Sequence, residues 1–591
     1  MKSFGIFNDE PTANEKGGNR DRSRLRFKKR RAAAKPMTPI MTLELKQTSY
    51  RDAESIIFDL SRHELIHTWT EGFVELQTFL EQHGGGIPVE VYLNTANHGL
   101  IIFSNLVPRI LSDSGRLIVA RYLAACLTNH LSIFGALEIL IKCTDRELTT
   151  VLKNLIRKGF LDDIGRYYRI GSVPIKILNP RETTAMEINK SKTISTCPYS
   201  RSYTVLTLNL GQTKSKISIV DVDQNGTHRV KEPLFFLPGL QELALTHTLD
   251  EFIQFLFIHC RARILSHASR IDLIGIGIAM PVLDGIPPYL PSGSNRFYFR
   301  TEHNDGWKSS LDRFATEFPD TPTFIENDGR AQAIGFAESS RMTSFLLIRF
   351  GTSLCAGIID EHGKIVEGYH ELSNIFLDLN DTTPCIEYAS QSARNYLSFN
   401  GIVHISKKLG LFQKYGFREN EGIVQILEKM LNEGTDTEIS DAALVYEALG
   451  RYLAAMALEL KRYCTIENVV VVGSTFSPTS SKLCARKFDQ TIQDAYENLN
   501  LIFAEPIQSV LGSNIGVAHQ AIKKFEILRN NPNTARAVTS DEIQESWHNL
   551  FAANLALACS QDPANNLLRR RTSLAQLGIP DNDVPSLTFI K

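Results

Sequence analysis

Residues 324–338 read FIENDGRAQAIGFAE and give the strongest indication of the fold. An apolar run ends at Glu326, Asn327 and Asp328, and a helix of small residues is predicted to follow. This order places a carboxylate and an amide at a strand-to-helix turn, where they can bind the hydroxyl of a polyol or take its proton. Alternatively, the Asn-Asp pair only caps the helix, since both residue types are favoured there.

A second predicted turn follows the first a short way along the sequence. Residues 351–357 read GTSLCAG and come directly after the apolar run 344–350. From about 203 to 525, short apolar runs rich in β-branched residues alternate with helical patterns. This alternation predicts an α/β architecture.

An earlier hairpin completes the pattern. Residues 204–210 and 217–222 read as two strands joined by a turn at Gly211. Together with the turns at Asp328 and Gly351, this order of motifs resembles the core of the ROK family (repressors, open reading frames, sugar kinases). The resemblance implies a two-lobed, actin-like fold with a cleft between the lobes. Further stretches that resemble the family are 274–285, 468–476 and 511–518.

The sugar-facing half of the family's cleft is partly present. The resemblance implies that Asp328 stands where kinases carry the general base and Asn327 where they carry a ligand of a sugar hydroxyl. By the same resemblance, Glu371, Glu387 and Trp307 are candidate sugar-binding residues.

The nucleotide-facing half is degraded. Asn209 stands where the resemblance places an aspartate that helps to hold Mg²⁺, and Gln212, Ser353 and Cys355 replace glycines that let backbone N–H groups approach phosphate. We therefore expect no catalytic residue, with Asp328 as the base only if the protein is active. The remnants of the nucleotide loops are Gly211, Thr213, Gly351, Thr352 and Gly473.

The zinc loop of the family is also absent from the sequence. The histidine of its motif is Asn374 here, residues 376–384 contain no cysteine, and Cys385 stands alone. A tetrahedral zinc site needs four ligands. We expect no metal and no cofactor.

Residues 113–171 are predicted to form a winged helix-turn-helix. We expect helices at 115–127, 133–140 and 145–158, the last capped by Thr144, and a two-stranded wing at 160–169. The stretch resembles the N-terminal domain of ROK regulators. A helical docking or dimerisation domain is the alternative. The expected DNA-contacting side chains are Arg146, Thr149, Thr150 and Lys153 on the third helix, and Arg166 and Arg169 in the wing.

Composition limits the protein class. The 591 residues carry a formal net charge of −1 and nine cysteines without a CxxC pair, which is typical of a reduced, cytoplasmic protein. No apolar run approaches the length of a membrane span, and no signal peptide is expected. Nine Lys or Arg and one acid lie between Arg20 and Lys35. Such a run is a solvated tail or, beside a DNA-binding domain, a phosphate-binding arm.

The sequence therefore predicts a ROK-type transcriptional regulator that binds double-stranded DNA, responds to a sugar or phospho-sugar, and forms a homodimer or homotetramer. An active sugar kinase with appended domains is one alternative, and a ligand-free regulator that uses the ROK body as a dimerisation scaffold is another. The predicted domains are a basic tail (1–40), an extension (41–112), the winged domain (113–171), a linker (172–202), lobe 1 (203–325), lobe 2 (326–525) and a C-terminal extension (526–591).

Overall fold

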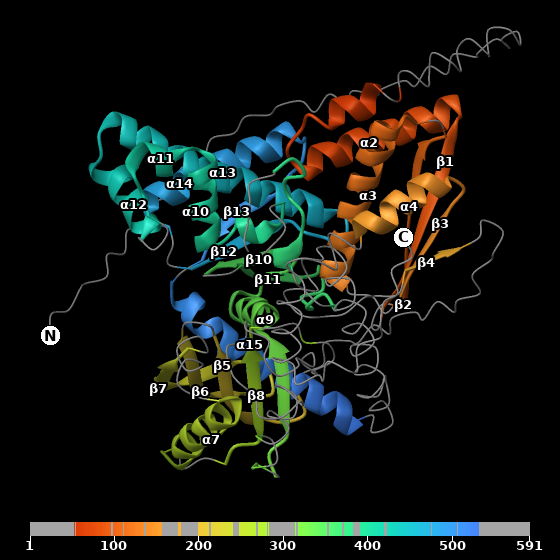
Figure 1. Ribbon diagram of the computed structural model, residues 1–591. Coiled ribbons are helices and arrows are strands. Elements are labelled where there is room, and N and C mark those ends of the chain that lie inside the picture. Colours follow the sequence, from red (N-terminus) through yellow and green to blue (C-terminus); the bar gives the residue numbers. More distant parts are fainter. Residues whose placement is uncertain are drawn as a thin grey trace, which may run out of the picture. The chain divides into compact units, whose positions relative to one another are not determined.

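The computed structural model describes residues 53, 55–95, 99–109, 111–134, 138–156, 175–178, 199–211, 214–239, 248–266, 270–279, 282, 314, 317–318, 320–351, 354–368, 372–381, 391–418, 422–473, 476–504 and 506–530. The strands among these residues form three sheets (Figure 1). The predicted basic tail, the wing, residues 179–198 of the linker and residues 531–591 lie outside the described residues.

Lobe 1 is built on a five-stranded sheet with order β7-β6-β5-β8-β9. β5 and β6 form the predicted hairpin, whereas β8 and β9 run parallel to β5. Every residue of β8 is buried, because α7 packs on one face of the sheet and α15 on the other (Figure 1). The elements are β5 (Tyr203–Leu210), β6 (Lys214–Val222), β7 (His228–Pro238), α7 (Leu249–Ser266), β8 (Leu273–Ile278), β9 (Thr323–Asn327) and α15 (Pro506–Asn530).

Lobe 2 is built on a four-stranded sheet with order β11-β10-β12-β13. β10, β12 and β13 are parallel and β11 is antiparallel to β10. Helix α9 covers one face, and a larger apolar core with α10, α12, α13 and α14 covers the other. The elements are α9 (Asp328–Ser340), β10 (Phe345–Phe350), β11 (Leu354–Ile359), α10 (Phe399–Lys408), α11 (Leu411–Tyr415), α12 (Ile423–Glu433), α13 (Asp436–Lys461), β12 (Asn468–Val472), α14 (Pro478–Asp494) and β13 (Asn500–Phe503), with short 3₁₀ turns at Leu372–Asn374 and Ala393–Asn395.

Helices α9 and α15 pack against each other at glycines. A methyl group on Gly516 would lie 1.7 Å from the carbonyl oxygen of Ala331, and one on Gly335 would lie 1.8 Å from that of Gly512. Only glycine permits such close approach of two backbones. The predicted small-residue helix is thus confirmed, and its small residues are explained by this contact.

The N-terminal unit comprises the described residues of 53–178. Its sheet has the order β2-β1-β3-β4, with β1 antiparallel to both β2 and β3 and with β4 parallel to β3. Its apolar core is contributed mainly by α2, α3 and the inner face of the sheet. The elements are α2 (Ile66–His83), β1 (Gly86–Thr95), β2 (Gly99–Pro108), α3 (Asp113–Phe134), β3 (Glu138–Cys143), α4 (Arg146–Ile156) and β4 (Ile175–Leu178).

Two sequence predictions for this unit are wrong. The helix predicted at 133–140 is strand β3 over Glu138–Cys143, and the first helix continues to Phe134. A short apolar run cannot be assigned to helix or strand by its pattern alone, and pairing with β1 decided this one. The boundary predicted at residue 112 divides a single sheet, since β1 precedes it and β3 follows it.

The lobe boundaries also differ from the prediction. β9 extends to Asn327 and pairs with β8, so the lobe 1 sheet continues past residue 325. α15 packs on lobe 1, although residues 326–525 were all assigned to lobe 2, and it continues to Asn530.

Among the described residues, α3 is the one helix whose length and apolar composition alone would allow it to cross a membrane. Its 22 residues include a window of mean hydropathy 1.4, of which 78% is buried inside the protein. No apolar run of this length was expected from the sequence. Its burial is that of a core helix.

Candidate functional site

The predicted site lies at the carboxyl edge of the lobe 1 sheet. Leu210 of β5 pairs with Ile278 of β8, and Ile278 pairs with Asn327 of β9. The turn at Gly211 and the start of α9 therefore lie at the same edge, where open parallel sheets commonly bind ligands. Lobe 2 reaches this edge as well, since a methyl group on Gly329 would lie 2.4 Å from the carbonyl oxygen of Ala356 in β11.

Asn327 is the N-cap of α9. Its Oδ1 accepts hydrogen bonds from the backbone N–H groups of Gly329 (2.9 Å) and Arg330 (3.0 Å). The capping interpretation is thus confirmed for its oxygen, and only the amide NH₂ could serve a sugar. The N-cap fixes the direction in which the first helical residue, Asp328, leaves the strand.

Beneath Asp328 lies a buried ion-pair network. Glu326 accepts from Arg330 Nε (2.9 Å), from Lys524 Nζ (3.2 Å) and from the backbone N–H of Asn327 (3.0 Å). Burial by itself would raise the pKa of Glu326, but the charges of Arg330 and Lys524 and these hydrogen bonds lower it to about 2. Neither Arg330 nor Lys524 was predicted from the sequence, although the i,i+4 spacing of Glu326 and Arg330 is the pattern of a helical ion pair.

Asp328 is the titratable group of the site. Burial raises its pKa above the ordinary aspartate value, although the charge of Arg349 and a hydrogen bond from the thiol of Cys355 oppose the rise. A raised pKa suits a base that works near neutral pH. However, Cys355 occupies part of the carboxylate's hydrogen-bonding capacity, at a position where the resemblance implies a glycine.

Two cations face this site from the two hairpins. Lys216 is opposite Asn209 in the β5–β6 pair, and Arg349 is opposite Cys355 in the β10–β11 pair. Burial, followed by the charges of Arg349 and Lys214, lowers the pKa of Lys216 to about 8. The charge of Arg349 thus acts on both Lys216 and Asp328. Neither cation was named from the sequence.

Asn209 has the environment expected of a site residue. Its side chain is 3% exposed, and its Oδ1 is buried without a hydrogen-bond partner among the described residues. An orphaned buried acceptor costs about 1–3 kcal/mol unless a ligand or water satisfies it. It carries no charge, so it cannot replace the electrostatic attraction of an aspartate for hydrated Mg²⁺.

The described nucleotide-loop remnants lie at strand ends. Gly351 follows β10, and Gly473 follows the adjacent β12 with φ +140°. Thr213 and Thr352 lie outside the described residues, as do the predicted sugar ligands Trp307, Glu371 and Glu387. Of the predicted sugar-binding set, the structure places Asn327 and Asp328.

The region of the missing zinc loop contains a lysine-centred network. Lys408 Nζ lies 2.7 Å from Asp378 Oδ2 and 3.6 Å from Asp381 Oδ2. Asp381 also accepts from Tyr396 (2.7 Å) and lies 3.0 Å from Nε2 of His404. Among the described residues, no cluster of three or more His, Cys, Asp or Glu side chains could hold a metal ion; Cys385 lies outside them.

The candidate DNA-contacting helix begins one residue later than predicted, and its described part extends to Ile156. α4 begins at Arg146, and Asp145 rather than Thr144 caps it by accepting from Leu148 N–H (2.9 Å). Thr149 is 2% exposed, so its assignment as a DNA contact is wrong. Arg146 and Thr150 are exposed and Lys153 is half-buried, whereas Arg166 and Arg169 lie outside the described residues. The carboxylates that pair with Arg116 beside the helix start belong to Asp113, Asp145 and Glu147.

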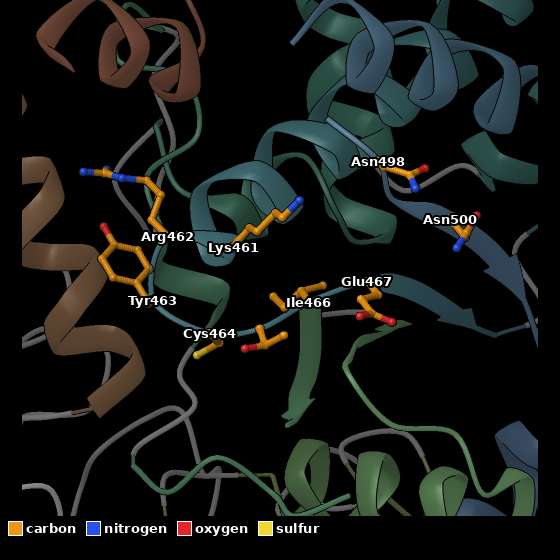
Figure 2. Close-up of a pocket in the computed structure, with 9 residues that line it drawn as sticks. Lys461, Arg462, Tyr463, Cys464, Ile466, Glu467, Asn498 and Asn500 are labelled. Atoms are coloured by element: carbon orange, nitrogen blue, oxygen red, sulfur yellow. The ribbon is translucent and has the colours of Figure 1, made fainter. Parts of the chain in front are cut away.

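A separate pocket of about 810 Å³ opens beside the end of α13. In Figure 2, Arg462 and Tyr463 point away from the side that carries Asn498 and Asn500. Lys461 is paired with Glu497 and Arg462 with Glu459. The pocket lies at the amino ends of β12 and β13, whereas the candidate site lies beyond the carboxyl end of β10.

No family model matches the sequence, and no curated protein matches it. A ROK family transcriptional regulator, a homologue of the E. coli MLC protein, is 18% identical over 55% of this chain and 80% of its own, with a TM-score of 0.42. The ROK hexokinase from Thermus thermophilus is 17% identical over 55% and 99%, with a TM-score of 0.42.

A ROK family protein from Streptococcus pneumoniae TIGR4, solved in complex with sucrose, is 13% identical over 55% of this chain and 99% of its own, with a TM-score of 0.39. The structural neighbours of this chain thus include ROK family proteins, both sugar kinases and a transcriptional regulator, at low identity and over about half of the chain.

Proposed function

We propose that this protein is a regulator that uses a kinase-like cleft to bind a sugar or phospho-sugar without phosphorylating it. The observation that carries this proposal is the packing of β11 against the start of α9, where Ala356 meets Gly329 and the neighbouring Cys355 thiol acts as a hydrogen-bond donor toward the Asp328 carboxylate. A kinase needs that carboxylate to take the proton of the sugar hydroxyl. Here a side chain from the lobe 2 hairpin competes for it.

Two further features favour binding over catalysis. Asn209 offers a neutral amide where Mg²⁺ requires a carboxylate for its charge. Ser353 and Cys355 carry side chains at positions where nucleotide phosphates need bare backbone N–H groups. Lys216 and Arg349 instead provide positive charge at the cleft, which suits a phosphorylated effector.

The proposed effector contacts are the amide of Asn327, the carboxylates of Asp328, Glu371 and Glu387, and the ring of Trp307. A thermal-shift screen of hexoses, amino sugars and their 6-phosphates, followed by ADP-release assays, tests the cleft. We expect a shift with at least one sugar and no ADP release. ADP release would establish the kinase alternative, for which the raised pKa of Asp328 is the favouring observation. No shift with any sugar would favour the ligand-free scaffold.

The proposed output is DNA binding in the cytoplasm by a homodimer or homotetramer. The candidate contacts are Arg146, Thr150 and Lys153 on α4, Arg166 and Arg169 after it, and the basic run 20–35. Basic side chains of this kind neutralise phosphates and release counterions. The acidic side chains near the start of α4 oppose binding there, so the helix requires a direct test.

Genome-wide DNA pull-down with the purified protein provides that test. The Arg146→Ala/Lys153→Ala variant is compared with Lys482→Ala/Lys487→Ala, which removes the same charge from α14 in lobe 2. We expect discrete enriched sites that disappear only with the α4 variant. Enrichment that both variants leave unchanged would remove α4 from the DNA interface, and no enrichment with the wild type would reject DNA binding.

A further inference from the structure

The N-terminal unit and lobe 2 share backbone hydrogen bonds. Ile66 N–H donates to Leu377 O and Leu379 N–H donates to Glu64 O, both at 2.9 Å, on either side of a β-bridge between Leu65 and Asp378. These bonds hold residues 377–379 of lobe 2 like a short strand against residues 64–66, where the chain enters α2.

Their apolar cores also interpenetrate. Leu65 and Ile133 of the N-terminal unit belong to the core of lobe 2, and Leu379 of lobe 2 belongs to the core of the N-terminal unit. Residues that contribute to each other's cores cannot separate without exposing apolar surface. The two parts are therefore expected to move as one body.

A row of polar contacts along α3 strengthens this junction. Asn129 donates to Glu459 Oε1 and accepts from Phe376 N–H, both at 2.8 Å, and neither Asn129 nor Glu459 is exposed. Arg462 pairs with Glu459 at 3.1 Å and donates to Thr70 of α2 at the same distance. The contacts of Asn129 and Thr70 are lost if the N-terminal unit leaves lobe 2, whereas the Arg462–Glu459 pair lies within lobe 2.

The end of α3 touches a segment that is tied to the candidate site. Gly368 has φ +134°, and a methyl group on it would lie 2.3 Å from the carbonyl oxygen of Ile133. Arg330 donates from Nη1 to the carbonyl oxygens of Val366 and Gly368, both at 3.1 Å, and from Nη2 to Glu367 at 2.9 Å. Arg330 lies in the first turn of α9, two residues after Asp328.

We propose that the N-terminal unit responds, through α3, to conformational change in the cleft. A displacement at the start of α9 is transmitted through Arg330 and residues 366–368 to the carboxyl end of α3. The N-terminal unit then moves together with lobe 2. The path connects a proposed ligand site to a unit that carries the proposed output. It depends on neither the sugar nor the DNA, so it can be tested if either is rejected.

Hydrogen exchange of the full-length protein, followed by mass spectrometry, tests the path. Gly368→Ala places a methyl group against Ile133, whereas the matched control Gly363→Ala also has positive φ (+74°) but meets only the methyl group of Thr343 at 3.5 Å. We expect Gly368→Ala to speed exchange about tenfold in peptides covering 126–134 and 328–335, which corresponds to the loss of about one buried hydrogen bond. Gly363→Ala should change exchange only in the turn 360–364 that follows β11.

A second pair tests the reverse direction and remains informative if Gly368→Ala fails to fold. Asn129→Ala removes the contacts with Glu459 and Phe376, whereas Thr128→Val on the same buried helix removes a hydroxyl that bonds only to Ala124 O of α3. We expect Asn129→Ala, but not Thr128→Val, to speed exchange at 328–335 and 366–376. The proposal would be overturned if Asn129→Ala sped exchange only in α3 and α13. It would also be overturned if Asn129→Ala and Thr128→Val had equal effects on exchange.

Discussion

The side-chain amide of Asn129 in α3 donates a 2.8 Å hydrogen bond to the carboxylate of Glu459 in α13, 330 residues later in the chain. Glu459 is fully buried and also accepts from Arg462 and from the hydroxyl of Tyr463 (2.7 Å). A buried carboxylate is tolerated only when several donors satisfy it. The N-terminal unit supplies one of these donors, so its folding and that of lobe 2 are coupled.

This coupling predicts a large loss of stability from a small change. Asn129→Ala should lower the free energy of unfolding by about 2 kcal/mol, because it removes one donor from Glu459 and leaves the N–H of Phe376 unpaired. Urea denaturation followed by circular dichroism measures the loss. Thr128→Val, which removes only a bond within α3, should cost less than about 1 kcal/mol. Equal losses would argue against a special role for the junction.

The Glu326–Arg330 pair predicts a pH dependence of stability. The pKa of Glu326 falls from an ordinary 4.5 to about 2 in the folded protein. A lowered folded-state pKa gives a stabilisation that is present above the unfolded pKa and is lost as the pH falls from about 4.5 toward 2. At neutral pH this amounts to about 3 kcal/mol.

Glu326→Gln provides the comparison for this prediction. The difference in unfolding free energy between wild type and variant should be largest at neutral pH and should shrink as the pH falls below about 4.5. Urea titrations at several pH values measure it. A difference that does not depend on pH would mean that the charge of Glu326 contributes nothing.

The charge of Asp328 should matter for effector binding. Asp328→Asn is expected to weaken binding of the sugar that gives the largest thermal shift by about tenfold or more, since charge-assisted hydrogen bonds contribute about 1.5–3 kcal/mol. Calorimetric titration measures the change. The control Asp320→Asn removes the same charge from an exposed turn and should leave the affinity unaltered. Unchanged affinity in Asp328→Asn would exclude this carboxylate from the effector site.

The contact between α9 and α15 predicts strong sensitivity to a single methyl group. Gly516→Ala would place its methyl group 1.7 Å from the carbonyl oxygen of Ala331, so the helices must separate. We expect a loss of at least about 3 kcal/mol. Gly410→Ala, whose methyl group meets no atom within 4 Å, should cost only the roughly 1 kcal/mol of a positive φ. Thermal unfolding of both variants decides whether packing or backbone strain dominates.

Elements with a long apolar pattern or a distinctive turn were predicted most accurately from the sequence. β5 and β10 coincide within one residue with the apolar runs that predicted them, β8 and β12 begin within one residue of the stretches 274–285 and 468–476, and α9 begins at Asp328 as expected. The prediction for 133–140 was wrong, because a short apolar run fits a helix or a strand equally well until its pairing partner is known. The prediction for Thr149 was also wrong, because its position on the helix suggested exposure to solvent but its side chain is only 2% exposed.

The sequence by itself determined the alternation of strands and helices from about 203 to 525, the position of Asp328 at a strand-to-helix turn, and the neutral side chain at Asn209, because these depend on local pattern and residue chemistry. The tertiary structure decided that Lys216, Arg349 and Cys355 share an environment with Asp328, and that Arg330 ties α9 to residues 366–368. It also decided that α3 lies in the core of both the N-terminal unit and lobe 2. Such contacts join residues tens to hundreds of positions apart, and no local periodicity encodes which distant side chain satisfies a buried charge.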